Sequence, residues 1–313
     1  MPTQKDAGKA FEFALITEAE KLLSAICKVT LLKDASYASS KASFQLYNSP
    51  EQLRYTQGAV AALTHICQLE PRLAAPSSKS DILELQLMPD SAGQQGDVRD
   101  ILFIRSNQNW EIGISAKNNH MAVKHSRLSD TLDFGSVWLG VNCAPKYFTS
   151  IAPVFQKLRT LKSQQAKWSS MQNKATTVYR PILDAFKGEL LSLHKNNSNI
   201  PQTLVRYLLG NRDFYKVIRR KSKVEILGFN LQGTLNKAAK GRNPNTVSKL
   251  KYPTQIIRFD YKPNSNNTLL LVCDQGWTIS FRIHNAETLV VPSLKFDINL
   301  VGTPNVYSHH ISY

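Results

Sequence analysis

The spacing of apolar residues changes once, near residue 82, and this change sets the fold class. Before it, apolar residues recur at three- and four-residue steps along 6–26 and 50–69, which predicts two helices. After it, residues 82–88 and 110–116 alternate apolar and polar side chains, and 101–104 is a short apolar run, which predicts three strands. The first third of the chain therefore predicts helices packed on a sheet.

The remaining two thirds mix both patterns. Further helices are predicted at 123–128, 149–195 and 201–209. Further strands are predicted at 137–141, 214–218, 224–229, 256–261, 269–273, 277–283, 289–291 and 294–300. The fold class is therefore α/β with a β-rich C-terminal region. A polar linker at 196–199 leads us to expect two domains, 1–198 and 199–313.

The chain is strongly basic. It carries 39 Lys and Arg against 23 Asp and Glu, which gives a net charge of +16 and a pI near 9.7. Residues 201–313 hold 16 of these cations and only 6 of the anions, so the excess is concentrated in the C-terminal third. A basic excess of this size indicates a polyphosphate partner such as a nucleic acid.

Several classes of protein are excluded. No apolar run approaches the roughly 18 residues that cross a bilayer, and Met1–Ala10 lacks the apolar core of a signal peptide. We therefore expect a cytoplasmic protein that does not engage a membrane. Cys27, Cys67, Cys143 and Cys273 form no C-x-x-C pair, so we expect buried thiols rather than a zinc ribbon or disulfides.

An aspartate and a lysine lie at matching ends of a predicted hairpin. Asp100 opens one strand and Lys117 ends the next, and in an antiparallel pair the start of one strand lies beside the end of its neighbour. Ser115 shares a face with Lys117. Such a group can hold a divalent cation and a phosphate together, and its hard oxygen ligands favour Mg²⁺. The pattern therefore indicates phosphodiester hydrolysis.

One carboxylate interrupts the apolar stripe of the first helix. Glu12 lies on the same side as Leu15, Ala19 and Leu23, where a side chain should face the core. A buried carboxylate needs a partner or a metal. The alternative is a helix-end glutamate that reaches solvent.

At Asp100 and at 115–117 the chain resembles the PD-(D/E)xK nuclease superfamily, in which an Asp at a strand start and a (D/E)xK tripeptide on the next strand form the metal site. The tripeptide here is Ser115-Ala116-Lys117, with serine at the acidic position. Four segments further resemble type II restriction endonucleases of the HaeIII family: 114–120, 122–129, 211–217 and 276–285.

This resemblance implies a mixed-sheet nuclease core flanked by helices, with a DNA-recognition region after it. It also implies double-stranded DNA as the substrate, GGCC as the target and the backbone carbonyl of Ala116 as a further metal ligand. A palindromic target favours two-fold symmetry, hence a homodimer.

Because a hydroxyl is a poorer metal ligand than a carboxylate, Ser115 requires a second acid from elsewhere. Glu12 is preferred, since many superfamily members carry an acid on the first helix. Asp130 is the alternative, since some relatives with this serine take a carboxylate from the following helix. Glu111 lies six residues from Lys117, about 20 Å along a strand, which is too far.

Two further aspartates have structural interpretations. Asp90 completes a literal Pro-Asp dipeptide, but no apolar strand follows it, so a loop position is expected. Asp97 precedes the strand that Asp100 opens and is typical of a turn.

Several cations are candidates for binding DNA phosphates. They follow the catalytic strand, lie on the strand near 216, or lie in the long polar loop near 242: His120, Lys124, His125, Arg127, Lys216, Arg219, Arg220 and Arg242. Each group has a second interpretation as a solvated surface, and for 216–223 this is a hydrated strand edge.

The sequence therefore predicts a Mg²⁺-dependent, site-specific endonuclease of double-stranded DNA, with Asp100, Lys117, Ser115 and Glu12 in the site and Asp100, Glu12 and Ala116 as metal ligands. Two alternatives remain. One is a non-catalytic DNA-binding protein with a degenerate nuclease core, and the other is a repair or recombination nuclease that recognises DNA structure.

Overall fold

A computed structural model describes residues 2–94, 96–119, 124–239 and 245–313, and the side chains of residues 93, 94, 125 and 239 lie outside this description. The chain forms two units, each built from separate segments. The first comprises Met1–Met121, Gly210–Leu250 and Asn305–Tyr313, and the second comprises Ala122–Leu209 and Lys251–Pro304. The boundary expected at 198/199 instead falls inside the second unit, between two helices.

The first unit is built on a seven-stranded mixed sheet. Its strands are β1 (Val29–Leu31), β2 (Leu83–Leu87), β3 (Ile101–Arg105), β4 (Trp110–Asn118), β6 (Phe214–Arg219), β7 (Lys223–Phe229) and β12 (Tyr307–Ser312). The order is β1-β2-β3-β4-β6-β7-β12, and only the β1/β2 and β4/β6 pairs are parallel. Segments distant in sequence thus lie side by side in one sheet.

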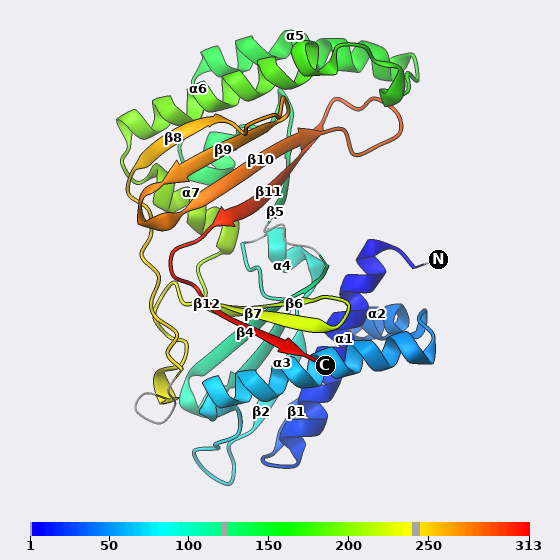
Figure 1. The fold of residues 1–313 in the computed structure, drawn as a ribbon, viewed down its shortest axis with the longest axis vertical. Helices are drawn as coiled ribbons and strands as arrows, with labels where there is room; N and C mark the ends of the chain where they lie inside the picture. Colours follow the sequence, from blue (N-terminus) through cyan, green and yellow to red (C-terminus); the bar gives the residue numbers. More distant parts are fainter. Residues whose placement is uncertain (1, 95, 120–123, 240–244) are drawn as a thin grey trace. The chain divides into compact units, whose positions relative to one another are not determined.

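Helices α1 (Gln4–Ser24), α2 (Ala35–Gln45) and α3 (Ser49–Leu69) gather on one side of this sheet (Figure 1). A short helix, α4 (Asp90–Gln94), precedes β3. Strand residues that face α1 and α3 alternate along each strand and are apolar, as in Ile112, Ile114 and Ala116 of β4. The residues between them point to the opposite face, and they are polar at Ser115 and Lys117 of β4 but apolar at Leu102 of β3 and Ile218 of β6.

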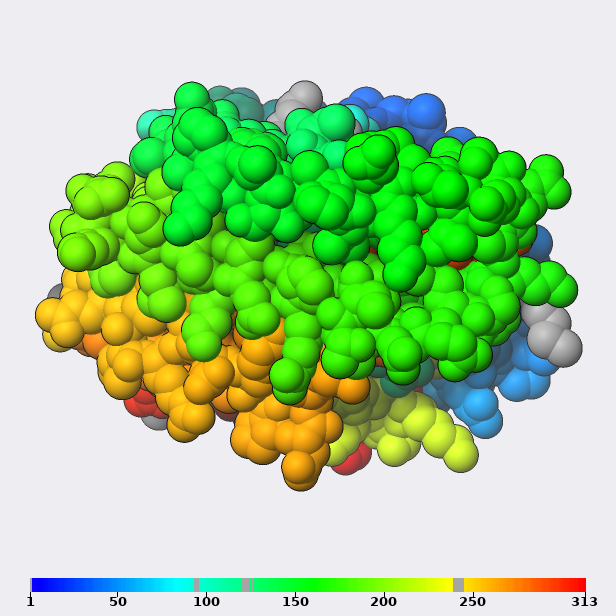
Figure 2. All heavy atoms as spheres, turned by 90° about the horizontal axis from the view of Figure 1, so that it is seen from above, coloured from blue at the N-terminus to red at the C-terminus, as the bar shows by residue number. Residues whose placement is uncertain are grey.

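The second unit has a five-stranded antiparallel sheet covered by helices. Its strands, in the order β5-β11-β10-β9-β8, are β5 (Lys124–Leu128), β11 (Leu294–Gly302), β10 (Thr278–His284), β9 (Thr268–Cys273) and β8 (Ile256–Tyr261). Helices α5 (Pro145–Ser163) and α6 (Arg180–Asn196) pack side by side, and Figure 2 shows their outer surface in green. With α7 (Ile200–Leu209) they enclose an aromatic core in which Phe186 contacts Phe134, Trp138, Phe281 and Phe296.

The α/β fold class is confirmed, and most helices and strands lie within a few residues of their predicted positions. The prediction of a helix at 123–128 is wrong. Lys124–Leu128 is strand β5, which pairs with β11 and buries the alternating residues Ser126 and Leu128. The strand predicted at 137–141 is also wrong. The chain forms a π-helical turn at Gly135–Leu139, in which Trp138 and Leu139 are buried and Val137 is exposed.

Other differences have a common cause. Residues 289–291 form no strand and make only an isolated bridge between Lys167 and Leu289. Strands β1 and β12 and helix α2 were not predicted, since they are short or polar and are stabilised by neighbours distant in sequence.

Cys143 and Cys273 are buried as expected, whereas Cys27 and Cys67 are only half-buried. Across the part of the chain that the structure describes, no helix has the length and apolarity to span a membrane.

Glu70 ties three segments of the first unit together. It follows α3, and its Oε1 accepts hydrogen bonds from the Tyr215 hydroxyl (2.8 Å) and the Asn236 backbone N–H (2.6 Å). Burial raises the pKa of Glu70 to about 7, although these hydrogen bonds oppose the shift. The folded state therefore binds this proton more tightly than the unfolded state.

We expect the free energy of unfolding to fall between about pH 4.5 and pH 7, because over this range the unfolded state has lost the Glu70 proton that the folded state still holds. The Glu70→Gln variant stays neutral, so this part of the pH dependence, on the order of 1–3 kcal/mol, should disappear. Urea denaturation at pH 5 and pH 8 measures it. A variant with the same pH dependence as the wild type would contradict the assignment.

Candidate active site

Asp100 joins the start of β3 to the end of β4. The backbone N–H of Asp100 donates to the Ile114 carbonyl (2.8 Å), which continues the β3/β4 ladder and sets Asp100 beside Ser115. One carboxylate oxygen, Oδ2, accepts three hydrogen bonds: from the Ala116 N–H (2.7 Å), the Lys117 ammonium (3.1 Å) and the Ser115 hydroxyl (3.3 Å). The aspartate and the lysine predicted to meet are therefore in direct contact.

These polar groups occupy the face of the sheet that the helices do not cover. Ile114 and Ala116 belong to the core beneath α1 and α3, so the alternating residues Ser115 and Lys117 point the other way. Ser115 is buried, while Lys117 and Asp100 are about one quarter exposed. The side chains of Asp100 and Lys117 are thus partly accessible to solvent, whereas Ser115 is not.

Glu12 is buried in α1, with 6% of its surface exposed, as its place on the apolar stripe predicted. Its Oε2 accepts a hydrogen bond from Lys9 (2.9 Å), and Lys9 also binds Asp90 (2.7 Å). Burial raises the pKa of Glu12 to about 7, and the charge of Asp100 adds to this, whereas Lys9 and Lys117 oppose it. The carboxylates of Glu12 and Asp100 therefore lie close enough to repel each other.

Two adjacent carboxylates fit a hard divalent cation, because such a cation removes their repulsion. Within residues 2–94, 96–119, 124–239 and 245–313, no group of three or more His, Cys, Asp or Glu gathers as a metal site. This donor set suits a cation that keeps several waters, as Mg²⁺ does, better than the complete protein shell of structural zinc.

The other acidic candidates bind cations of the protein. Asp130 lies in the second unit, where it forms an ion pair with Arg159 (2.8 Å). Asp90 begins α4 instead of lying in a loop, and Lys9 and Lys5 bind its carboxylate.

Asp97 and Glu111 also bind cationic side chains of the protein. Asp97 accepts hydrogen bonds from the backbone and guanidinium of Arg99, as a turn residue does. Glu111 binds Arg99 (2.9 Å) and lies near Arg212 (3.7 Å), at the strand end away from Lys117.

The predicted DNA-binding cations fall into three groups. His120 and Arg242 lie outside the described residues, and so does the side chain of His125. In the second unit, the Lys124 ammonium donates to the Tyr207 carbonyl (3.0 Å), and the exposed Arg127 donates to the Ser293 carbonyl.

The third group lies in the first unit. The alternative interpretation of 216–223 as a hydrated edge is wrong for β6, because β6 is an inner strand between β4 and β7. Arg219 is 3% exposed. It lies over the Tyr55 ring (4.0 Å) and binds Glu51 and Asn118, so its guanidinium serves the fold. Arg220 forms an ion pair with Glu225, and Lys216 is buried beside Ser115.

Three residues near the site were not predicted to belong to it: Lys9, Arg99 and Lys216. Arg99 is buried and packs across β4 at Gly113, two residues before Ser115. A Cβ at Gly113 would lie 2.6 Å from Arg99 Cγ and 2.8 Å from its Cβ. The sequence signal was available, because a glycine in the middle of a strand marks a close approach.

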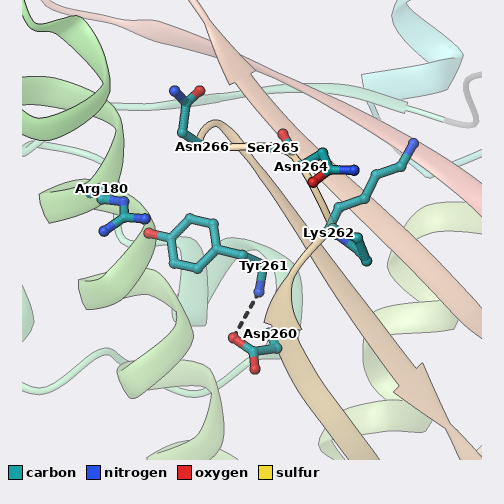
Figure 3. Close-up of a pocket in the computed structure, with 8 residues that line it drawn as sticks. Arg180, Asp260, Tyr261, Lys262, Asn264, Ser265 and Asn266 are labelled. Carbon is teal, nitrogen blue, oxygen red and sulfur yellow. Dashed lines mark hydrogen bonds between the residues drawn. The ribbon is translucent and has the colours of Figure 1, made fainter.

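A polar pocket of about 500 Å³ in the second unit is lined by Arg180 and residues 260–266 (Figure 3). Its polar groups engage one another: Arg180 lies over the Tyr261 ring, and Asp260 accepts hydrogen bonds from the Tyr261 N–H and Lys187. The Tyr261 hydroxyl donates to Asp184. This pocket lacks the paired carboxylates of the Asp100 site, which remains the better candidate for catalysis.

The Gly113→Ala variant should lose about 1–3 kcal/mol of stability, because Arg99 must move and its ion pairs with Asp97 and Glu111 must loosen. Gly8→Ala in α1 is the matched control, since its added Cβ meets nothing within 4 Å and helical alanine is favoured. Thermal melts of both variants measure the difference. Equal melting temperatures would show that the contact carries no strain.

Comparisons with known proteins identify the family of the chain. The family model for HaeIII restriction endonucleases matches residues 8–304. The type II restriction enzyme HaeIII of Haemophilus aegyptius is 43% identical over 303 residues, which cover 96% of this chain and 94% of that protein. No solved structure matches the chain at a significant level. The match spans both units, and the chain belongs to the HaeIII restriction endonuclease family.

Proposed function

We propose that this protein is a Mg²⁺-dependent type II restriction endonuclease that cuts both strands of DNA at GGCC and so restricts foreign DNA. The contact of Lys117 and Asp100 at the β3/β4 junction carries the proposal, together with the family membership. The name of the 43% identical relative supports the activity, and the net charge of +16 supports a polyanionic substrate.

Each side chain of the site has a proposed task. Asp100, Glu12 and the Ala116 carbonyl would hold the cation, and a bound Mg²⁺ supplies a Lewis acid that neutralises phosphate charge and lowers the pKa of a water molecule. The Lys117 ammonium donates hydrogen bonds that orient the attacking water and hold the scissile phosphate. Ser115 fixes Asp100 through its hydroxyl.

DNA binding needs cations beyond the site. We propose that His120, Lys124, His125, Arg127, Arg220 and Arg242 contact phosphates on either side of the cut, where they add affinity and salt dependence. A palindromic GGCC target also favours a homodimer, which would present one site to each strand.

A plasmid digest tests the activity. We expect discrete fragments that end at GGCC in Mg²⁺ and intact plasmid in EDTA. The absence of cutting would identify a degenerate nuclease core, and nicking at structured sites would identify a structure-selective nuclease. Either result would overturn the proposal.

Lys117→Ala should lower the cleavage rate by at least about 100-fold and retain most of the affinity for target DNA, because one phosphate contact is lost among several. Single-turnover cleavage and a binding titration in Ca²⁺ measure the two effects. A variant that cleaves at the wild-type rate would remove Lys117 from the site.

The second carboxylate can be identified by metal affinity. Glu12→Gln should weaken Ca²⁺ binding to the complex with uncut target DNA by at least about tenfold, since a ligand is lost. Asp130→Asn, which leaves the Glu12 and Asp100 pair intact, should bind Ca²⁺ as the wild type does. Calorimetry measures both affinities, and the opposite pattern would assign the ligand to Asp130.

A further inference from the structure

Lys216 lies in one row with the acid and the serine of the site. In the parallel pair β4/β6, Ser115 is the register partner of Lys216, and Asp100 lies beside Ser115 on its other side. Laterally paired residues of a sheet point to the same face. The neighbours Tyr215 and Val217 point into the core beneath the helices. Lys216 therefore points to the face that carries Asp100, Ser115 and Lys117.

Lys216 also experiences the charges of the site. Its side chain is 5% exposed. Burial, together with the charge of Lys117, lowers the pKa of Lys216 to about 8, while Glu225 and Asp100 oppose the shift. Glu225 is also shared with Arg220 (3.4 Å). Two ammonium groups that repel each other on one face are stabilised when an anion binds between them.

The serine of the tripeptide leaves position 115, beside Lys216, without a carboxylate. A carboxylate at position 115 would lie next to Lys216 and neutralise it, whereas the Ser115 hydroxyl donates its hydrogen bond to Asp100. Asp100 therefore lies on the β3 side of Ser115 and Lys216 on its β6 side, and Lys117 donates a hydrogen bond to Asp100.

We propose that Lys216 is a second catalytic lysine, whose ammonium binds a non-bridging oxygen of the scissile phosphate. This inference rests on the proposed function. In the hydrolysis, water loses one proton as its oxygen forms a bond to phosphorus, the bond from phosphorus to the leaving oxygen breaks, and the leaving oxygen takes up one proton from solvent. Negative charge grows on the non-bridging oxygens in between, and Lys216 stabilises this charge without transferring a proton.

The test pairs a protein change with a DNA change. Lys216→Met keeps the length of the side chain and removes its charge. Single-turnover cleavage of the target should fall by at least about 100-fold. In Ca²⁺, wild-type affinity should fall when a neutral methylphosphonate replaces the phosphate at the cut position, and the loss should be smaller for Lys216→Met, in which only Lys117 and the cation still contact that phosphate. This coupling reports direct contact, which a purely structural lysine would not show.

Lys41→Met, an exposed change on α2, is the matched control and should match the wild type in rate and coupling. Melting temperatures establish that each variant is folded. If Lys216→Met does not fold, Lys216→Arg, which keeps a cation, should retain part of the coupling.

Two results would overturn the role of Lys216: a folded variant that cleaves within about threefold of the wild-type rate, or one that loses affinity for the methylphosphonate duplex as the wild type does. A wild-type protein that cuts no DNA would instead overturn the proposed function, so the two failures are distinguishable.

Discussion

The site depends on one carboxylate oxygen. Oδ2 of Asp100 accepts hydrogen bonds from Ser115, Ala116 and Lys117, which are consecutive residues of β4. The backbone bond from Asp100 to Ile114 adds a fourth connection between the strands. These four hydrogen bonds hold the start of β3 against the end of β4, where the chemistry is proposed.

The first helix contributes to packing and to electrostatics at once. Residues such as Phe11 and Leu15 bury α1 against the sheet, and the same docking places Glu12 near Asp100. Burial and the charge of Asp100 both disfavour the ionised form of Glu12, and Lys9 and Lys117 offset this only in part. A site of this kind trades fold stability for affinity toward a cation, which is a recurrent property of functional sites.

Residues within one hairpin were predictable, whereas pairings between distant segments were not. The contact of Asp100 with Lys117 spans 17 residues and follows from antiparallel geometry alone. Lys216 is about a hundred residues further on, and its place beside Ser115 depends on the parallel insertion of β6 next to β4. A hydrated edge remained an alternative for the basic run 216–223, because nothing local shows that β6 is inserted beside β4.

The sequence by itself determined the α/β class, the helices and strands with strong periodicity, and the pairing of an acid with a lysine at a hairpin end. It also marked Glu12, because a carboxylate on an apolar stripe conflicts with burial. Only the tertiary structure decided that β5 is a strand, that the two units interleave along the chain, and that Arg219 serves the core while Lys216 faces the site. The reason is physical: local periodicity reports which side of an element is buried, and the neighbour that buries it is fixed by contacts between distant residues.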